Sequence, residues 1–325
     1  MAADPTPHDT PTPRPGPSSS ASALARLQRT LTAALLVVSL SWLIGWWHVS
    51  TTTAILGCAA IALGHIWVLG CECAAAAMVN RRAEPTPTSP PSPGFPRWLR
   101  AWATECSMTP RVFYWRQPFR SQTVPDHLSP QAAGRRGVVL VHGFVCNRGF
   151  WTPWLKQLVQ AGHPFMAVNL EPVVASIDDY VPTLEQAVQQ VTQATGLPPL
   201  LVCHSMGGLV ARAWLRQAGP EATARVAHIV TIATPHHGTW LGNRSRQRNG
   251  RQMACGNEWL ETLRAAEPAE RYQRFTCWHS NCDNIVFPAA SATLAGADNR
   301  FVPGMPHVAL AFRPEVMRET LAWLN

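Results

Sequence analysis

The stretch from Leu200 to Val210 contains the residues best suited to chemistry. An apolar run of strand length leads into His204-Ser205-Met206-Gly207-Gly208. The run suits a buried parallel strand, and the glycines allow a sharp turn into a helix. Such a turn presents the Ser205 hydroxyl at the carboxyl end of a sheet, beside free N–H groups that favour negative charge. The pattern predicts a nucleophilic serine; a serine that only caps the helix is the alternative.

A serine hydroxyl is a poor nucleophile at neutral pH and needs a base, which a carboxylate must orient. His307 lies just before a predicted final helix, and Asp283 lies just after a predicted strand at 272–278. Asp283 follows Ser205 by 78 positions and precedes His307 by 24. These spacings leave room for the elements that would bring the three side chains to one edge of a sheet.

Other residues compete for these roles. Asp298 precedes His307 by only 9 positions, which is short for an intervening strand, so we prefer Asp283 as the acid. His279 lies too close to the predicted acid strand to act as the base. The alternative interpretation of His307 is a surface histidine without a catalytic role.

Acyl transfer also needs N–H donors aimed at the oxygen that becomes negative. Met206, the residue after the nucleophile, should supply one donor. The second should come from the loop after the predicted strand at 137–143, with Phe144 as the expected residue. Because both donors are backbone groups, the sequence predicts the position of the loop rather than the identity of the donor.

Taken together, these motifs resemble the α/β-hydrolase superfamily from about residue 111 to the end of the chain. The segments Val141–Phe144 and Cys203–Gly208, with Asp283 and His307, follow the order used in that superfamily. Cys203 departs from the pattern, because glycine usually stands there. Ile232–Thr239 (IATPHHGT), with the later segment 256–263, is similar to bacterial triacylglycerol lipases and esterases.

The resemblance implies hydrolysis of carboxylic esters through an acyl-enzyme. It does not decide the substrate, because thioesterases and acyltransferases use the same fold. Some of these lipases bind calcium, but we identify no ligand set here, and we expect neither a metal nor a cofactor. A catalytically silent hydrolase fold acting as an interaction module at the membrane is an alternative from a different class, and a transport component is another.

The remaining elements fit an α/β-hydrolase fold, a mostly parallel sheet with helices on both faces. Apolar runs that alternate with amphipathic segments predict such a sheet. Besides the strand before Ser205, we expect strands at 111–116, 137–143, 165–170, 226–232 and 272–278, and helices at 150–161, 177–195, 206–218, 258–265 and 314–324.

The N-terminal part has a different character. No charged Asp, Glu, Lys or Arg occurs from Thr30 to Cys71, which is long enough for two membrane spans of about 20 residues each. A polar turn at 48–53 would join spans at about 30–47 and 54–75. A single signal-anchor span and a buried helical hairpin are the alternatives.

These features divide the chain into four parts. Residues 1–29 include a segment rich in Pro and Ser that we expect to be disordered, and residues 30–79 hold the predicted transmembrane hairpin. A Pro-rich linker at 80–96 should act as a spacer, and the catalytic domain should occupy 97–325.

Arginines flank the hairpin on both outer sides, at Arg26 and Arg29 and at Arg81 and Arg82, and none lies in the turn. The positive-inside tendency places both ends in the cytoplasm. We therefore expect a bacterial inner-membrane protein with its catalytic domain on the cytoplasmic side.

Within the predicted catalytic domain, residues 240–268 are expected to form a cap or lid over the active site. They contain a basic run and then a short helix with Trp259, Leu260 and Leu263 on it. The basic run would attract anionic headgroups, and the apolar helix face would cover an acyl pocket. A solvated loop followed by a helix packed on the core is the alternative.

The net charge of +8 comes almost entirely from arginines scattered along the chain, a distribution that does not indicate nucleic-acid binding. The expected partners are an ester or lipid substrate and the membrane; the sequence does not indicate an oligomeric state. The nine cysteines have no zinc-ligand spacing. We expect free thiols, with a Cys277–Cys282 disulfide as the alternative.

Overall fold

The computed structural model describes residues 22–129 and 132–324. Its centre is a parallel six-stranded sheet with the order β2-β1-β3-β4-β5-β6. The predicted α/β-hydrolase fold class is confirmed. The strands are β1 (Val138–Val141), β2 (Phe165–Ala167), β3 (Leu200–His204), β4 (His228–Ile232), β5 (Phe275–His279) and β6 (Asp298–Phe301).

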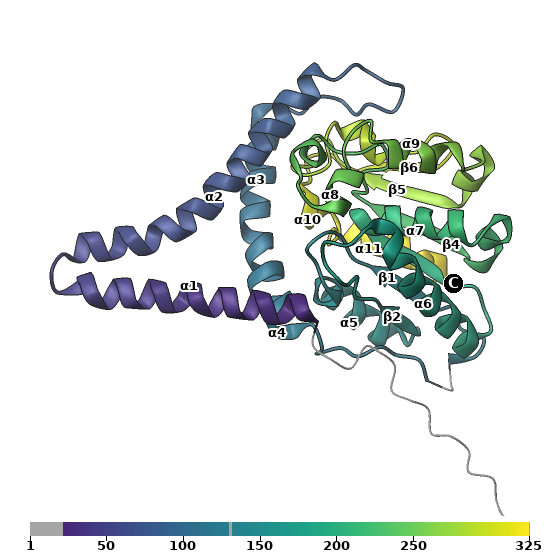
Figure 1. Cartoon of the computed structure of the whole chain (residues 1–325), viewed down its shortest axis with the longest axis horizontal. Helices are drawn as coiled ribbons and strands as arrows, with labels where there is room; N and C mark the ends of the chain where they lie inside the picture. The colour runs from purple at the N-terminus through teal and green to yellow at the C-terminus, as the bar shows by residue number, and fades with distance from the viewer. Residues whose placement is uncertain (1–21, 130–131, 325) are drawn as a thin grey trace, which may run out of the picture.

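Helices cover both faces of the sheet (Figure 1). In β1 and β3, alternate residues face opposite layers because side chains alternate along a strand. Val139 and Leu201 pack in the core formed with α6 and α7, whereas Val138 and Leu200 pack in the core formed with α5 and α11. These helices are α5 (Thr152–Ala161), α6 (Val181–Thr195), α7 (Met206–Gln217) and α11 (Pro314–Leu321).

The parallel register places the carboxyl ends of the strands together. Val141 on β1 pairs with Cys203 on β3, and His204 pairs with Ile232 on β4. Ile232 in turn pairs with Trp278 on β5. The residues that follow these strands therefore meet at one edge, which is where ligands bind in open α/β sheets.

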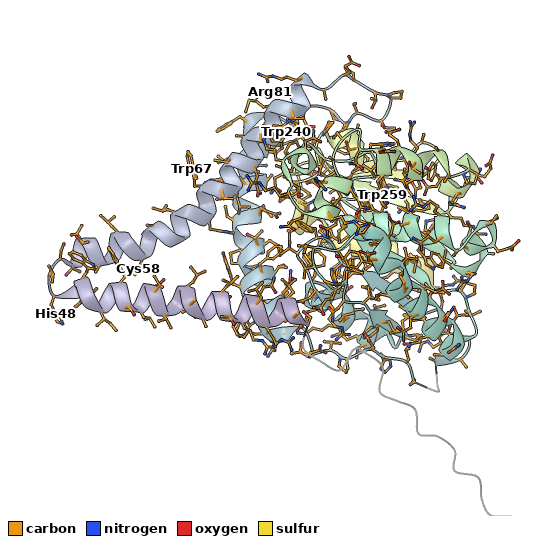
Figure 2. All side chains as sticks on the ribbon, in the orientation of Figure 1. His48, Cys58, Trp67, Arg81, Trp240 and Trp259 are labelled. Atoms are coloured by element: carbon orange, nitrogen blue, oxygen red, sulfur yellow. The ribbon has the colours of Figure 1, made fainter. Side chains whose placement is uncertain are left out.

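Two long helices, α1 (Ala23–Trp47) and α2 (Thr51–Arg82), extend away from the sheet and meet at a turn that carries His48 (Figures 1 and 2). Both are long and apolar enough to cross a membrane. Large apolar side chains such as Leu36, Ile44 and Leu63 are exposed on them. A helix that is apolar on all sides and exposed suits a lipid environment.

The predicted disordered segment 1–29 is too long. Helix α1 already begins at Ala23, with the Ser22 hydroxyl accepting a hydrogen bond from the N–H of Ala25. Leu24 and Ala25 are buried, so packing extends the helix past the expected boundary. The rest of that prediction, residues 1–21, lies outside the described residues.

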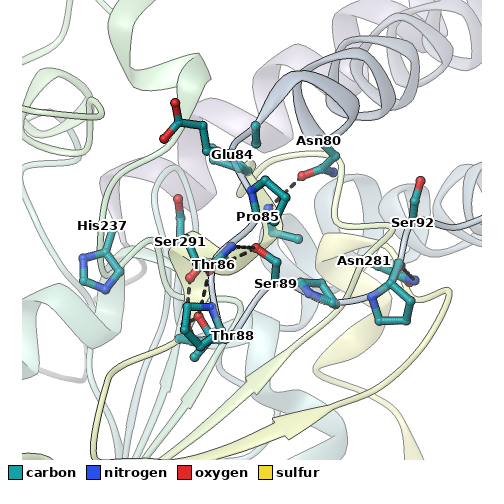
Figure 3. Close-up of a pocket in the computed structure, with 18 of the residues that line it drawn as sticks. Asn80, Glu84, Pro85, Thr86, Thr88, Ser89, Ser92, His237, Asn281 and Ser291 are labelled. Carbon is teal, nitrogen blue, oxygen red and sulfur yellow. Dashed lines mark hydrogen bonds between the residues drawn. The ribbon is translucent and has the colours of Figure 1, made fainter.

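The Pro-rich linker is not a free spacer. Helix α2 runs on to Arg82, and the next helix, α3 (Phe95–Thr109), begins before residue 97. The chain between them lies on the catalytic domain around a cavity of about 1030 Å³ (Figure 3). The Asn281 amide donates to the carbonyl of Pro91, and Thr293 hydrogen-bonds to Thr88.

The predicted strand at 111–116 is wrong. Residues 110–116 form wide, π-type helical turns that continue α3 into α4 (Gln117–Arg120). Val112 is fully buried in the core beside α5. Its aromatic and β-branched neighbours favour strands in isolation, but packing of the helix against the domain overrides that propensity.

The other predicted strands and helices are present, with shifted ends. Strand β6, which begins at Asp298, was not predicted. Helix α3 was not predicted either. The domain also contains the short helices α8 (Arg248–Gln252), α9 (Glu258–Ala265) and α10 (His307–Leu310), of which only α9 was predicted. All nine cysteines are free thiols, so Cys277 and Cys282 do not form a disulfide.

Candidate active site

Ser205 occupies a strained turn between β3 and α7. Its backbone φ is 54° and ψ is −127°, a conformation that non-glycine residues rarely adopt. Gly207 makes the turn possible, since a Cβ there would collide with the carbonyl oxygen of Val141. Cys203, at the position where glycine is usual, is fully buried in the core. A small thiol is accommodated there and leaves the turn intact.

The structure brings Ser205, His307 and Asp283 together. The Oγ of Ser205 lies 3.1 Å from Nε2 of His307. Nδ1 of the same ring lies 3.1 and 3.0 Å from the two carboxylate oxygens of Asp283. All three residues are buried. The arrangement allows His307 to take the proton of Ser205 while Asp283 orients the ring.

Asp283 is itself fixed by the backbone. Its Oδ1 accepts hydrogen bonds of 2.8 Å from the N–H groups of Ile285 and Val286. The competing acid, Asp298, lies on the edge strand β6, where it pairs with Arg300. His279 ends β5 and makes a ring contact with Phe301.

The expected oxyanion donors lie beside the serine. Phe144 lines the cavity over Ser205, and Met206 is the first residue of α7. Within the described part of the chain, neither backbone N–H donates a hydrogen bond to a protein acceptor. Two free donors beside a serine are therefore suited to bind a developing oxyanion.

Three carboxylates raise the pKa of His307. Burial lowers its pKa, but Asp283, Glu105 and Glu72 raise it more, and the net pKa lies above the ordinary value of 6.5. Burial raises the pKa of Glu105 to about 7. Glu105 accepts hydrogen bonds from the N–H groups of Val308 and Ala309, at the start of α10. Its carboxylate thus holds the backbone that carries His307.

Glu72 acts on the same histidine from α2. One of its oxygens accepts a 2.8 Å hydrogen bond from the side-chain amide of Asn284. The Asn284 Oδ1 accepts the backbone N–H of His307 at 3.1 Å. The apolar hairpin therefore reaches His307 through two hydrogen bonds.

Two other histidines at the site have structural roles. The ring of His142 bridges the carbonyl of Gly143 and the N–H of Leu170, and burial lowers its pKa to about 4. His204 stacks on Phe150 with ring centroids 4.4 Å apart. Burial holds the pKa of His204 well below its ordinary value. Both rings stay neutral near pH 7 and shape the loops beside Ser205.

A cavity of about 330 Å³ lies over Ser205. Its walls come from the loop after β1, from α10, and from helices α2 and α3 with the helical turns that follow α3. In the described part of the chain, no residue of 240–268 lines this cavity. The prediction that this segment forms a lid over the site is therefore wrong.

Residues 240–268 pack elsewhere. The Gln252 side chain bonds to Ser176 and to the N–H of Ile177, just before α6. The Trp259 indole donates to Asp178 at 2.7 Å, and Leu260 is buried in the core beside α7. The apolar face that suggested a lid is used to pack the segment on the core, and α2 and α3 cover the site instead.

The sequence did not reveal Glu72, Glu105 or Asn284 as parts of the site. Glu72 is the first acidic residue after the apolar N-terminal stretch, which was the one available signal. Glu105 is fully buried in an amphipathic helix, and no motif in the neighbouring sequence identifies it as part of the site. Among the described residues, no group of three or more His, Cys, Asp or Glu side chains is arranged to hold a metal ion.

The sequence model of the alpha/beta hydrolase family matches residues 138–323, more than half of the chain. This chain belongs to the alpha/beta hydrolase family. The match covers the sheet and all three residues Ser205, Asp283 and His307, and it begins after the hairpin, α3 and α4. Among curated proteins, no sequence match was found.

Solved structures with a TM-score above 0.5 share this alpha/beta hydrolase fold. The mature form of Bacillus licheniformis lipase BlEst2 is 18% identical, with a TM-score of 0.51; the alignment covers 60% of this chain and 95% of that one. Its propeptide form is 17% identical, with a TM-score of 0.51 and coverages of 62% and 52%. Aspergillus fumigatus lipase B is 20% identical, with a TM-score of 0.49 and coverages of 57% and 51%.

Proposed function

We propose that this protein is a membrane-anchored serine hydrolase that cleaves carboxylic esters through an acyl-enzyme. The observation that carries the proposal is the continuous contact from Ser205 Oγ through the His307 ring to Asp283. Relatives that are named lipases support the reaction class. An intact and buried triad argues against a silent interaction module.

In the first half of the reaction, Ser205 Oγ attacks the ester carbonyl while His307 Nε2 accepts the hydroxyl proton. The N–H groups of Phe144 and Met206 bind the oxyanion of the tetrahedral intermediate. His307 then gives the proton to the leaving alcohol, the C–O bond breaks, and an acyl-Ser205 ester remains. In the second half, water repeats the sequence with His307 as base, and the acid is released.

The triad is tested by substitution. Ser205→Ala and His307→Ala should each lower kcat on a short ester by roughly 10⁴-fold or more, because the members of a triad act as a unit. Asp283→Asn should cost as much or less. Asp298→Asn is the matched control and should leave kcat within about threefold of wild type. Near-normal activity of Asp283→Asn with loss in Asp298→Asn would overturn the acid assignment.

A fluorophosphonate probe separates the enzyme from a silent module. The wild-type protein should be labelled, and Ser205→Ala should not, because the probe reacts only with an activated serine. Absence of labelling in a folded wild-type protein would reject the proposed function. A panel of esters of increasing chain length, with Ser205→Ala as the blank, would then define the acyl preference.

Membrane attachment is the second part of the proposal. Both α1 and α2 are long and apolar enough to span a membrane, and their large apolar side chains are mostly exposed. Arg26 and Arg29 lie near the start of α1, and Arg81 and Arg82 lie in the last turn of α2. Both arginine-bearing ends lie toward the catalytic domain, and the turn with His48 lies far from it (Figures 1 and 2). We infer an inner-membrane protein of a bacterium with its domain on the cytoplasmic side.

Topology reporters test this orientation. A reporter fused at the N-terminus and one inserted after Arg82 should both give cytoplasmic signals, and one inserted at Val49 should give a periplasmic signal. A periplasmic signal after Arg82 would show that the chain crosses the membrane an odd number of times, and the catalytic domain would then lie outside the cytoplasm.

A further inference from the structure

The cavity over Ser205 shares one wall with the apolar hairpin. His65, Val68, Leu69 and Glu72 of α2 all line it. Helix α2 is held in this position by α3: the His65 ring lies 2.8 Å from the Thr109 hydroxyl, and the Trp102 indole donates to the carbonyl of Ile66. The helix that could span the membrane is therefore also part of the substrate site.

The cavity opens beside that helix. Val68 and Tyr114 both line it, yet 55% of Val68 and 40% of Tyr114 remain exposed. By contrast, Leu69 is almost fully buried. The neighbouring residues Trp67 and Trp115 are exposed as well, and Trp67 points outward from α2 in Figure 2. Exposed apolar and aromatic side chains thus lie at this side of the cavity.

The depth of this opening follows from the helix geometry. Val68 follows Thr51, the first residue of α2, by 17 positions, and Arg29 precedes Trp47, the last residue of α1, by 18. At about 1.5 Å per residue, both lie roughly 26 Å from the turn, measured along their own helices. The hydrocarbon core of a bilayer is about 30 Å thick. The opening and Arg29 thus lie near the boundary between acyl chains and headgroups, where the ester groups of glycerolipids are found.

We propose that the cavity receives acyl esters of bilayer glycerolipids sideways from the membrane, through the opening between Val68 and Tyr114. This inference rests on the proposed ester hydrolysis and names its substrate class. An acyl chain stays beside α2 while its ester carbonyl reaches Ser205. Ser205 takes the acyl group, the proton passes through His307 to the glycerol oxygen, and water then releases the fatty acid. The lipid never has to leave the bilayer.

The test uses the full-length protein in vesicles of phosphatidylethanolamine and phosphatidylglycerol that contain a fluorogenic diacyl phospholipid. The wild-type protein should hydrolyse the probe in its own bilayer at least tenfold faster than the same probe in separate, protein-free vesicles. Equal rates in both would overturn the inference, because a substrate taken up from the aqueous side does not depend on sharing a bilayer with the enzyme.

A variant pair tests the opening itself. Val68→Trp should lower the ratio of lipid to butyrate-ester turnover at least tenfold. Leu63→Trp, on an equally exposed part of α2 that does not line the cavity, should change it less than twofold. Equal ratios in both variants would overturn the inference.

The outcomes also separate the two proposals. Hydrolysis of a soluble butyrate ester without hydrolysis of the lipid in the enzyme's own bilayer would reject only the lateral entry. Absence of both ester hydrolysis and fluorophosphonate labelling would reject the proposed function as well.

Discussion

His307 lies among three carboxylates that reach it from separate parts of the chain. Asp283 follows β5 and contacts the ring directly. Glu105 on α3 binds the backbone just after His307, and Glu72 on α2 acts through Asn284. In the proposed mechanism, these negative charges would stabilise the imidazolium that forms when His307 takes the proton of Ser205. Two of the three carboxylates come from outside the part of the chain that matches the family.

The charge on Glu105 should be visible in the pH profile. His307 must be neutral to act as base, and its pKa lies above 6.5, so kcat/KM should rise with pH through a step above 6.5. Above its own pKa of about 7, the Glu105 carboxylate is negative and favours the imidazolium; Glu105→Gln removes that charge, so the step should move to lower pH. Glu258→Gln, an exposed carboxylate on α9, is the control. An unmoved step in Glu105→Gln would show that the role of this residue is only structural.

At the scale of elements, a buried ion pair ties α7 to the segment after α9, and the same arginine also binds the loop after β4. The guanidinium of Arg212 on α7 donates to both oxygens of Glu267, at 3.1 and 3.0 Å, and to the carbonyl of His236 at 2.9 Å. Tyr272 adds a hydrogen bond to Glu267. Both charged side chains are fully buried. The hydrogen bond to His236 fixes the segment Ile232–Thr239, which contains Thr234. The Thr234 hydroxyl donates to the Ser205 carbonyl.

Breaking this pair should destabilise the fold. Glu267→Gln leaves a buried guanidinium without its counter-charge, so we expect a loss of about 3–5 kcal/mol of unfolding free energy. Chemical denaturation in detergent measures it, with Glu270→Gln as the exposed control in the same segment. A loss below 1 kcal/mol in Glu267→Gln would mean that the guanidinium keeps adequate partners without the carboxylate.

At the scale of the molecule, the hairpin and the catalytic domain form one structure. Cys73 and Ala76 of α2 pack with Trp98 and Ala101 of α3 and with Phe287 of the domain. The Asn80 side chain accepts the N–H of Ala289 at 2.8 Å. The expectation that residues 80–96 act as a spacer does not agree with these contacts. Removing α2 would expose a packed apolar cluster.

Truncation tests this coupling. A protein that begins at Gly94 should lose solubility and at least tenfold in kcat/KM on a short ester, because the cavity loses a wall and Asn284 loses Glu72. A protein that begins at Ser50 keeps α2 and is the matched control; it should retain activity in detergent. Full activity of the shorter protein would show that α2 serves only as an anchor.

The sequence alone determined much of this molecule, because the relevant signals are local. The apolar runs at β1, β3 and β4 need burial on both faces, and the glycine-rich turn after Ser205 has few conformations open to it. Because parallel strands end at one edge of the sheet, the order and spacing of Asp283 and His307 were sufficient to predict that both lie near Ser205. One long stretch without charge, divided by a polar turn, was likewise sufficient to predict two helices, α1 and α2.

Only the tertiary structure decided what surrounds Ser205. Segment 110–116 is helical because Val112 packs into the core, and 240–268 is not a lid because its apolar side chains pack near α6 and α7. Glu72 meets Asn284 across 212 positions, and Glu105 meets Val308 across 203. No local period or motif encodes such contacts. They exist because residues of α2 and α3 pack against the sheet domain, and that packing makes α2 a wall of the cavity over Ser205.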